Sequence, residues 1–155
     1  MTPAESPTDR IAKLGITLPE PAPAGVYRAA IRTGNQIYVA GQLPMRDGAL
    51  VHPGRLGDTV TVEQGAEAAR VCAINALGAT NALLGTLEDL RIIRAVGLVA
   101  ATPEFTQHPA VINGASEFLK EIFGDERGVG TRVAFGVASL PLGSSVEFEL
   151  LLEIY

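Results

Sequence analysis

The chain has 155 residues, with 12 Lys and Arg against 17 Asp and Glu, so its formal net charge is −5 at pH 7. This length predicts one domain that buries about 70% of its unfolded surface, and the acidic balance, with no run of basic residues, argues against a nucleic-acid partner. The single cysteine excludes an internal disulfide, and the two histidines, His52 and His108, lie too far apart for a metal motif.

The N-terminal part of the chain predicts a helix, a linker and a hairpin. Residues 6–15 contain a capping serine, an acidic residue in the first turn and a terminal glycine, which predicts a short helix. The prolines that follow predict an extended linker, so helix and Pro-rich linker occupy about residues 6–25 of a single domain, 1–155. Residues 27–32 and 36–41 are β-prone runs joined by Thr33-Gly34-Asn35, which predicts a hairpin. The start of the chain resembles no export signal, and no apolar stretch approaches the length of a membrane span, so we expect a cytoplasmic protein.

The middle of the chain predicts a loop, a long helix and an inner strand. Residues 45–58 are rich in Gly, Pro and Asp and predict a loop long enough to be functional. Thr61 and Gln64 form a capping box, which opens an Ala-rich helix that extends to about Leu84 and stops at Gly85. Residues 92–101 are continuously apolar, which predicts an inner strand.

The last third predicts one helix and two strands. Apolar residues recur at helical spacing over 110–123, with Gly124 as the stop. The runs 131–138 and 145–154 predict strands, so the expected order is ββαβαββ, an α+β fold. The even positions of the run 131–138 carry an arginine, alanines and a glycine, a face that suits a packed partner and indicates oligomerisation.

Arg132 is the polar residue that this strand pattern singles out. A guanidinium among valine, alanine and phenylalanine loses hydration, so we expect a planar anionic partner, either a protein carboxylate or a ligand. A plain hairpin between 131–138 and 145–154 would place Arg132 and Glu147 on one face but about four residues, roughly 13 Å, out of register. Either the two strands are not neighbours, or each residue faces a cleft shared with another subunit.

Several short motifs follow one another along the chain in a specific order. They are Thr33-Gly34-Asn35 leading to Val39-Ala40-Gly41-Gln42-Leu43-Pro44, Asn113 in the second long helix, Arg132 with Val137-Ala138-Ser139-Leu140-Pro141, and Val146-Glu147-Phe148-Glu149. Together they resemble the Rid or YjgF-like family of reactive intermediate deaminases, also labelled endoribonuclease L-PSP, from about residue 27 to 153. The N-terminal helix and the longer loop after Pro44 look like a longer-chain subgroup.

The resemblance implies a chorismate-mutase-like fold, with a mixed sheet, two main helices packed on one of its faces, and a homotrimer with clefts between subunits. It also implies that Arg132 grips a substrate carboxylate, while Glu147, fifteen positions later, positions or activates water. Tyr27 would cover the pocket or donate a hydrogen bond, and Asn113 would order a loop or the ligand.

Two residues depart from the family pattern. Ala40 stands where many deaminases have serine before Gly-Gln, and Ala134 stands where many have cysteine two residues after the arginine. Both positions belong to the implied substrate-binding site. Ala134 still offers backbone groups, whereas Ala40 cannot replace a hydroxyl.

The leading hypothesis is hydrolysis of reactive 2-imino or 2-enamino acids to 2-keto acids and ammonia, without a metal or organic cofactor. The first alternative is a trimeric protein that binds a keto acid or related carboxylate without turnover, as the two alanines suggest. An endoribonuclease is the third, and the acidic balance argues against it.

Structural explanations compete at each candidate residue. Arg132 would form an ion pair with Glu149, Glu153 or a neighbouring subunit, and Glu147 would be one of three carboxylates on a solvated strand face. Tyr27 and Asn113 would be an aromatic residue at a strand edge and an exposed helix residue.

Overall fold

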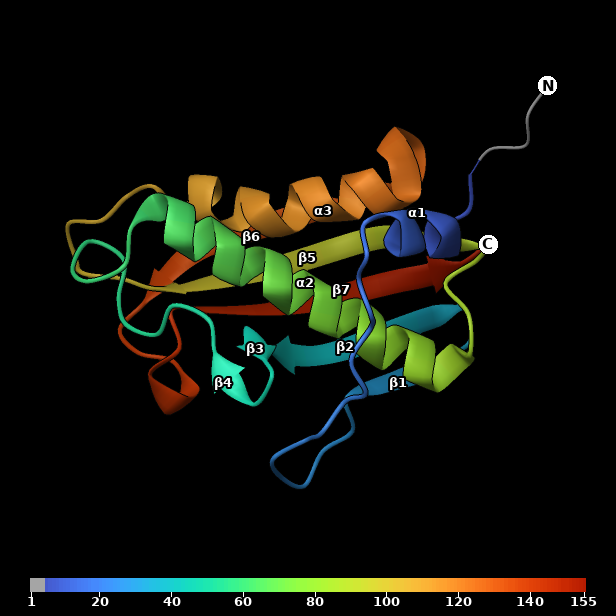
Figure 1. Cartoon of the computed structure of the whole chain (residues 1–155), viewed down its shortest axis with the longest axis horizontal. Helices are drawn as coiled ribbons and strands as arrows, with labels where there is room; N and C mark the ends of the chain where they lie inside the picture. Colours follow the sequence, from blue (N-terminus) through green and yellow to red (C-terminus); the bar gives the residue numbers. More distant parts are fainter. Residues whose placement is uncertain (1–4) are drawn as a thin grey trace.

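The computed structural model describes residues 5–155. Its main sheet consists of β1 (Ala30–Thr33), β2 (Gln36–Gln42), β5 (Leu90–Ala100), β6 (Thr131–Val137) and β7 (Val146–Ile154), in the order β1-β2-β7-β5-β6. β5 and β6 run parallel and the other pairs are antiparallel. Two long helices, α2 (Val62–Leu84) and α3 (His108–Gly128), lie together over one face of this sheet (Figure 1). The predicted α+β class, mixed sheet and one-sided helical layer are confirmed.

The long helices begin and end largely where the sequence predicts. At the start of α2 the Thr61 hydroxyl accepts a hydrogen bond from Gln64 N at 3.1 Å, and Gln64 Oε1 accepts one from Thr61 N at 3.0 Å. Gly85 ends the helix with a left-handed φ of 75°, which glycine adopts without steric cost. Gly124 was expected to stop α3, but it forms a kink with φ 81° and one more turn follows.

The two helices cross at small residues, which allows their backbones to approach closely. A Cβ at Gly114 of α3 would overlap the carbonyl oxygen of Ala66 and lie 2.6 Å from its carbonyl carbon. Apolar side chains from both helices and the sheet fill the space between the layers, and the largest fully buried ones include Phe118, Phe148, Leu77 and Leu152. No helix within residues 5–155 is long and apolar enough to cross a membrane.

The N-terminal segment packs on the outside of the helical layer. Helix α1 (Pro7–Lys13) begins at the predicted cap Ser6, and Arg10 donates to the carbonyls of Glu121 and Ile122 near the end of α3, at 3.3 and 3.2 Å. The following linker crosses α2 on its way to β1 (Figure 1). At the crossing, Gly78 leaves room for Pro19, whose carbonyl oxygen a side chain at that position would overlap.

Two sequence expectations about segment boundaries are corrected. Residues 27–29 lie outside the first strand, which begins only at Ala30. The expected loop at 45–58 contains a short hairpin, β3 (Met45–Arg46) and β4 (Ala49–Leu50). Asn75 of α2 holds this hairpin by donating to the carbonyls of Leu43 and Met45 at 2.9 and 3.0 Å. Strands of two residues are too short to show an alternating pattern, so they could not be predicted from periodicity.

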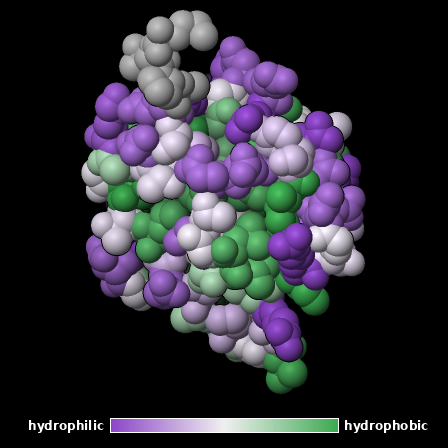
Figure 2. Space-filling view, turned by 90° about the vertical axis from the view of Figure 1, so that its right-hand side faces the viewer, coloured by the Kyte–Doolittle hydropathy of each residue, from purple (hydrophilic) through white to green (hydrophobic). Residues whose placement is uncertain are grey.

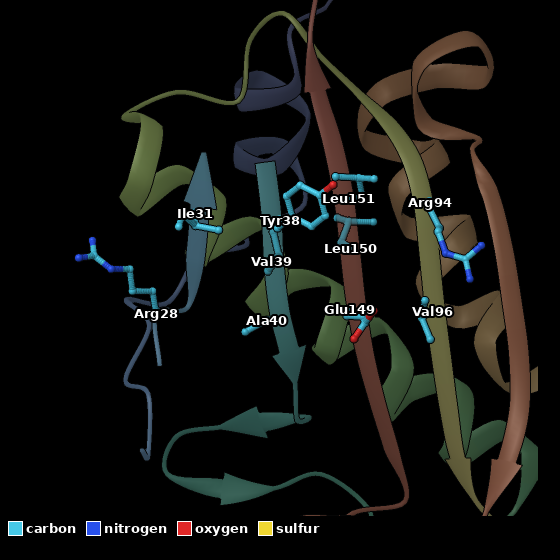
Figure 3. Close-up of a pocket in the computed structure, with 10 residues that line it drawn as sticks. All are labelled: Arg28, Ile31, Tyr38, Val39, Ala40, Arg94, Val96, Glu149, Leu150 and Leu151. Atoms are coloured by element: carbon cyan, nitrogen blue, oxygen red, sulfur yellow. The ribbon is translucent and has the colours of Figure 1, made fainter. Parts of the chain in front are cut away.

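The strand register decides which face of the sheet each residue occupies. Ala95 of β5 lies between Arg132 of β6 and Leu150 of β7, and the buried side chains of Ala95 and Leu150 face the helices. Leu98, three residues further along β5, lies between Phe135 and Glu147 and faces the other way. We call this second face, which carries no helix of the described chain, the open face; Figure 3 looks onto it, with the helices behind the strands.

The small-residue face of β6 meets a partner within the same chain. A Cβ at Gly136 would lie 2.6 Å from His108 Nε2 of α3, and one at Gly97 of β5 would lie 2.5 Å from Ile112 Cδ1. The even positions of β6 therefore face α3, which accounts for their small side chains within one chain, and oligomerisation stays a prediction. The exposed apolar side chains of the sheet instead belong to the open face, where Ile31, Tyr38 and Phe135 are exposed. At the end of the molecule that carries the C-terminus, polar side chains surround a group of exposed apolar ones (Figure 2).

Candidate functional site

Arg132 points from the start of β6 toward α3, where neutral oxygen atoms hold it. Its Nη1 donates to Asn113 Oδ1 at 2.8 Å and to Ser116 Oγ at 3.1 Å, while its Nη2 lies 3.4 Å from the carbonyl of Pro109. Asn113 and Ser116 lie three residues apart on α3, so both face the same side of the helix. The two hydrogen bonds use both protons of Nη1 and fix the plane of the guanidinium.

The positive charge of Arg132 has no carboxylate within ion-pair distance anywhere in residues 5–155. Glu153, one of the expected structural partners, instead accepts from Arg91 Nε at 2.7 Å, and Glu149 lies on the open face. The prediction that Arg132 forms an ion pair with Glu149 or Glu153 of its own chain is therefore wrong. The Nε and Nη2 protons on the outer edge of the guanidinium form a fork that suits a planar carboxylate.

A cleft opens beside this fork, between α3 and the first residues of β6, with a volume of about 340 Å³. Its wall has apolar surface from Ile92, Ala95 and Leu119, and polar or charged groups from Ser116, Glu117, Lys120 and Arg132. Ala134, the next residue of β6 on the same face, pairs with Gly97. The cleft thus combines an anchoring cation with apolar walls, which is typical of a site for a small organic acid.

Glu147 lies on the open face of β7 and packs against β2. Its carboxyl group rests on the backbone of Gly41, where a Cβ would overlap Glu147 Oε1 and lie 3.0 Å from Cδ. Burial raises the pKa of the Glu147 carboxyl above its ordinary value, and the neighbouring Glu149 carboxylate raises it further. Glu147 is thereby distinguished from Glu153, which is held in an ion pair with Arg91.

The structure does not bring Arg132 and Glu147 together within one chain. β5 separates β6 from β7, so the two strands are not neighbours, which was one of the two expected alternatives. The plain hairpin that would place both residues on one face is therefore absent, and the register through β5 decides the faces instead. The register places Arg132 level with Ala95 and Glu147 level with Leu98, on opposite faces of the sheet.

The other expected site residues divide between these two faces. Asn113 contacts Arg132 directly, and Ala134 lies on the same face of β6. Ala40 belongs to the open face, where it lines a shallow hollow with Tyr38 and Glu149 (Figure 3). Tyr27 is exposed in the segment before β1, and its hydroxyl accepts from Ala24 N at 3.4 Å rather than reaching Arg132.

Sequence reasoning missed Ser116 and the spatial role of Gly41. The spacing of Asn113 and Ser116 was visible, but a serine on an amphipathic helix is ordinarily a solvated residue. Gly41 was visible only as part of a motif. Within residues 5–155 no three His, Cys, Asp or Glu side chains gather into a group suited to a metal ion.

Comparisons with known proteins give a consistent result over nearly the whole chain. A family model described as "YjgF/chorismate mutase-like, putative endoribonuclease" matches residues 8–154. Protein TCP17 of Trypanosoma cruzi is 40% identical over 144 residues, which cover 92% of this chain and 90% of that protein.

Two solved structures are similar in both sequence and fold. The protein Atu1372 of Agrobacterium tumefaciens, described as having unknown function, is 40% identical with a TM-score of 0.86, over 94% of this chain and 91% of that one. A "putative endoribonuclease" of Shewanella oneidensis is 32% identical with a TM-score of 0.90, over 96% of this chain and 99% of that one.

Proposed function

Because the chain belongs to the YjgF/chorismate mutase-like family, we propose that it hydrolyses reactive 2-imino and 2-enamino acids to 2-keto acids and ammonia. The observation that carries this proposal is the guanidinium of Arg132, which lines a cleft and is held at Nη1 by Asn113 and Ser116 and at Nη2 by the Pro109 carbonyl. Nε makes no hydrogen bond within residues 5–155 and Nη2 has a second proton, so the Nε–Nη2 edge can receive a ligand. Such an edge clamps a substrate carboxylate through two parallel hydrogen bonds and so orients the imine carbon.

The proposed site requires more than one copy of the chain. A small imino acid cannot contact Arg132 and Glu147 of the same chain, since they lie on opposite faces of the sheet. We therefore place the active clefts of a homotrimer where the α3–β6 edge of one copy meets the open face of another. The apolar side chains exposed on the open face, Ile31, Tyr38 and Phe135, support burial of that face in an assembly.

In this arrangement Glu147 acts as the general base. Its raised pKa makes its carboxylate a stronger base than an ordinary glutamate. Glu147 takes a proton from water as the water oxygen bonds to the imine carbon. Glu147 passes that proton to the nitrogen, which gives the carbinolamine. The hydroxyl proton of the carbinolamine is then transferred to the nitrogen, the C–N bond breaks as the C=O bond forms, and ammonia leaves with the 2-keto acid as the other product.

One observation favours binding without turnover as a second candidate function. Ala40 lines the open-face hollow near the candidate base and provides no hydroxyl that could orient a water or an imine nitrogen. A chain that keeps the Arg132 clamp but not the chemistry would bind a keto acid or a related carboxylate. The endoribonuclease label of the family finds less support, since the net charge is −5 and RNA binding depends on positive charge. The cytoplasmic location stays a prediction.

The test measures ammonia and keto-acid release from a panel of imino acids generated in situ by an amino-acid oxidase. We expect wild type to accelerate release, Arg132→Ala to lose the acceleration, and Arg32→Ala, which removes an exposed arginine from β1, to retain it. No acceleration across the panel by a folded assembly would reject hydrolysis, and keto-acid binding that Arg132→Ala abolishes would then support the binding function.

A further inference from the structure

Gly41 lies at an irregular point of the sheet, where the register between β2 and β7 shifts between Val39 and Gln42. Such a bulge re-aims the residues around it and is common beside functional sites. The Gln42 side chain donates to the Ala40 carbonyl at 3.0 Å and bridges the shifted segment around Gly41. The backbone beneath the Glu147 carboxyl therefore has a defined shape.

The side chain of Glu147 packs directly on Gly41. A Cβ there would overlap Oε1 of Glu147, with Cδ at 3.0 Å and Cγ at 3.3 Å. Gly41 is not among the glycines with positive φ, so its backbone is open to any residue. A glycine is required here for space rather than for torsion, and the space is occupied by the carboxyl group of Glu147.

We propose that Gly41 is a positioning residue that seats the carboxyl group of Glu147 low against the sheet, in the orientation from which it activates water. This inference rests on the proposed function, because it assigns Gly41 a role in that reaction. The seat keeps the carboxyl partly away from solvent and near Glu149, the two causes that raise the pKa of Glu147. Without the seat the carboxyl would extend into water and lose both its orientation and its altered basicity.

The substitution Gly41→Ala should change the position of the Glu147 carboxyl without changing the fold. The added methyl would meet the end of a flexible side chain, so Glu147 moves and the backbone stays. Gly114→Ala would be different, because there the obstacle is the backbone of Ala66. We therefore expect Gly41→Ala to fold and assemble like wild type while its Glu147 carboxyl is displaced.

The first measurement is a ¹³C NMR titration of glutamate carboxyl groups, with the Glu147 signal assigned by its absence in Glu147→Gln. In Gly41→Ala the pKa of Glu147 should fall toward its ordinary value. The matched control is Gly136→Ala, also a strand glycine whose Cβ would meet the end of a side chain, His108 Nε2 at 2.6 Å. It should leave the Glu147 titration unchanged. An unchanged titration in Gly41→Ala would overturn the proposal, and this readout holds whether or not the protein hydrolyses imines.

The second measurement is imine hydrolysis. Displacing a catalytic group by about 1 Å can cost on the order of 100-fold in rate, so we expect kcat of Gly41→Ala to fall about 10- to 100-fold with KM unchanged. The acidic limb of its pH–rate profile should move to lower pH. Gly41→Ala combined with Glu147→Gln should be no slower than Glu147→Gln alone, because Gly41 acts through Glu147. A further loss of rate in the combined variant would overturn the positioning role. If wild type has no activity, the proposed function is rejected, and the titration alone tests whether Gly41 seats the Glu147 carboxyl.

Discussion

The pair Asn113 and Ser116 should determine how tightly the protein holds a carboxylate, through the orientation of Arg132. Each side chain accepts one hydrogen bond from Nη1, at 2.8 and 3.1 Å. Hydrogen bonds to charged groups contribute about 1.5–3 kcal/mol. Arg132 is only half-buried, so water replaces a lost partner in part, and we expect about 1 kcal/mol or less for each.

Since 1.4 kcal/mol corresponds to about a tenfold change in affinity, Ser116→Ala should weaken binding of 2-oxobutanoate roughly 3- to 5-fold, and Asn113→Ala/Ser116→Ala roughly 10- to 30-fold. Isothermal titration calorimetry with this stable keto acid measures the effect without turnover. Ser139→Ala is the control, because Ser139 is exposed and its hydroxyl has no hydrogen-bond partner in the described part of the chain.

If Asn113 and Ser116 act only through Arg132, neither substitution should weaken binding further in an Arg132→Ala background. In the hydrolysis assay KM should rise while kcat changes little, since a carboxylate clamp binds substrate and transition state alike. A Ser116→Ala variant with unchanged affinity and a tenfold lower kcat would refute this reasoning, because it would place the hydroxyl at the reacting atoms.

Three further predictions concern stability and reactivity. Gly114→Ala should destabilise the fold by about 3 kcal/mol, at the upper end for overpacking, because the added methyl meets the backbone of Ala66. Urea unfolding measures this loss, and a variant as stable as wild type would contradict the close helix crossing. Glu147→Gln should raise the melting temperature at pH 8 but not at pH 3. A glutamate whose pKa is raised by folding stabilises the fold fully below its ordinary pKa, and this stability is lost as the pH rises through the raised pKa. The neutral glutamine removes that loss at pH 8. Calorimetry at both pH values tests the sign, and a lower melting temperature at pH 8 would be incompatible with it. Cys72 should resist thiol reagents until the protein unfolds, since burial and, secondarily, Glu147 raise its pKa; rapid labelling of native protein would show that the residue is accessible.

Features that depend on neighbouring residues in the sequence were predictable. The capping box of Thr61 and Gln64 and the left-handed Gly85 are complete within a few residues, so the bounds of α2 followed from the sequence almost unchanged. The kink at Gly124 shows the limit of such signals, because a further turn follows a residue that ordinarily ends a helix. Arg10 of α1 donates to the carbonyls of Glu121 and Ile122 just before the kink, a contact far away in sequence.

The face assignments were not predictable, because they depend on which strands become neighbours. The insertion of β5 between β6 and β7 is a long-range choice, and it reverses the side on which Arg132 lies relative to Glu147. Alternation alone likewise treated Glu147 and Glu149 as equal. Only the contact with Gly41, far away in sequence, separates them.

The division of the candidate residues between two faces of one sheet has a genetic consequence. If each cleft takes Arg132 from one subunit and Glu147 from another, a variant lacking only the arginine and a variant lacking only the glutamate remain complementary. Subunits of the two inactive proteins, unfolded and reassembled together, would then rebuild some intact clefts and recover activity that neither has alone. Conversely, a subunit that lacks both the arginine and the glutamate would inactivate the cleft on each of its two sides, and so would lower the activity of wild-type subunits assembled with it. Dilution that separates the subunits would abolish catalysis without unfolding a single chain.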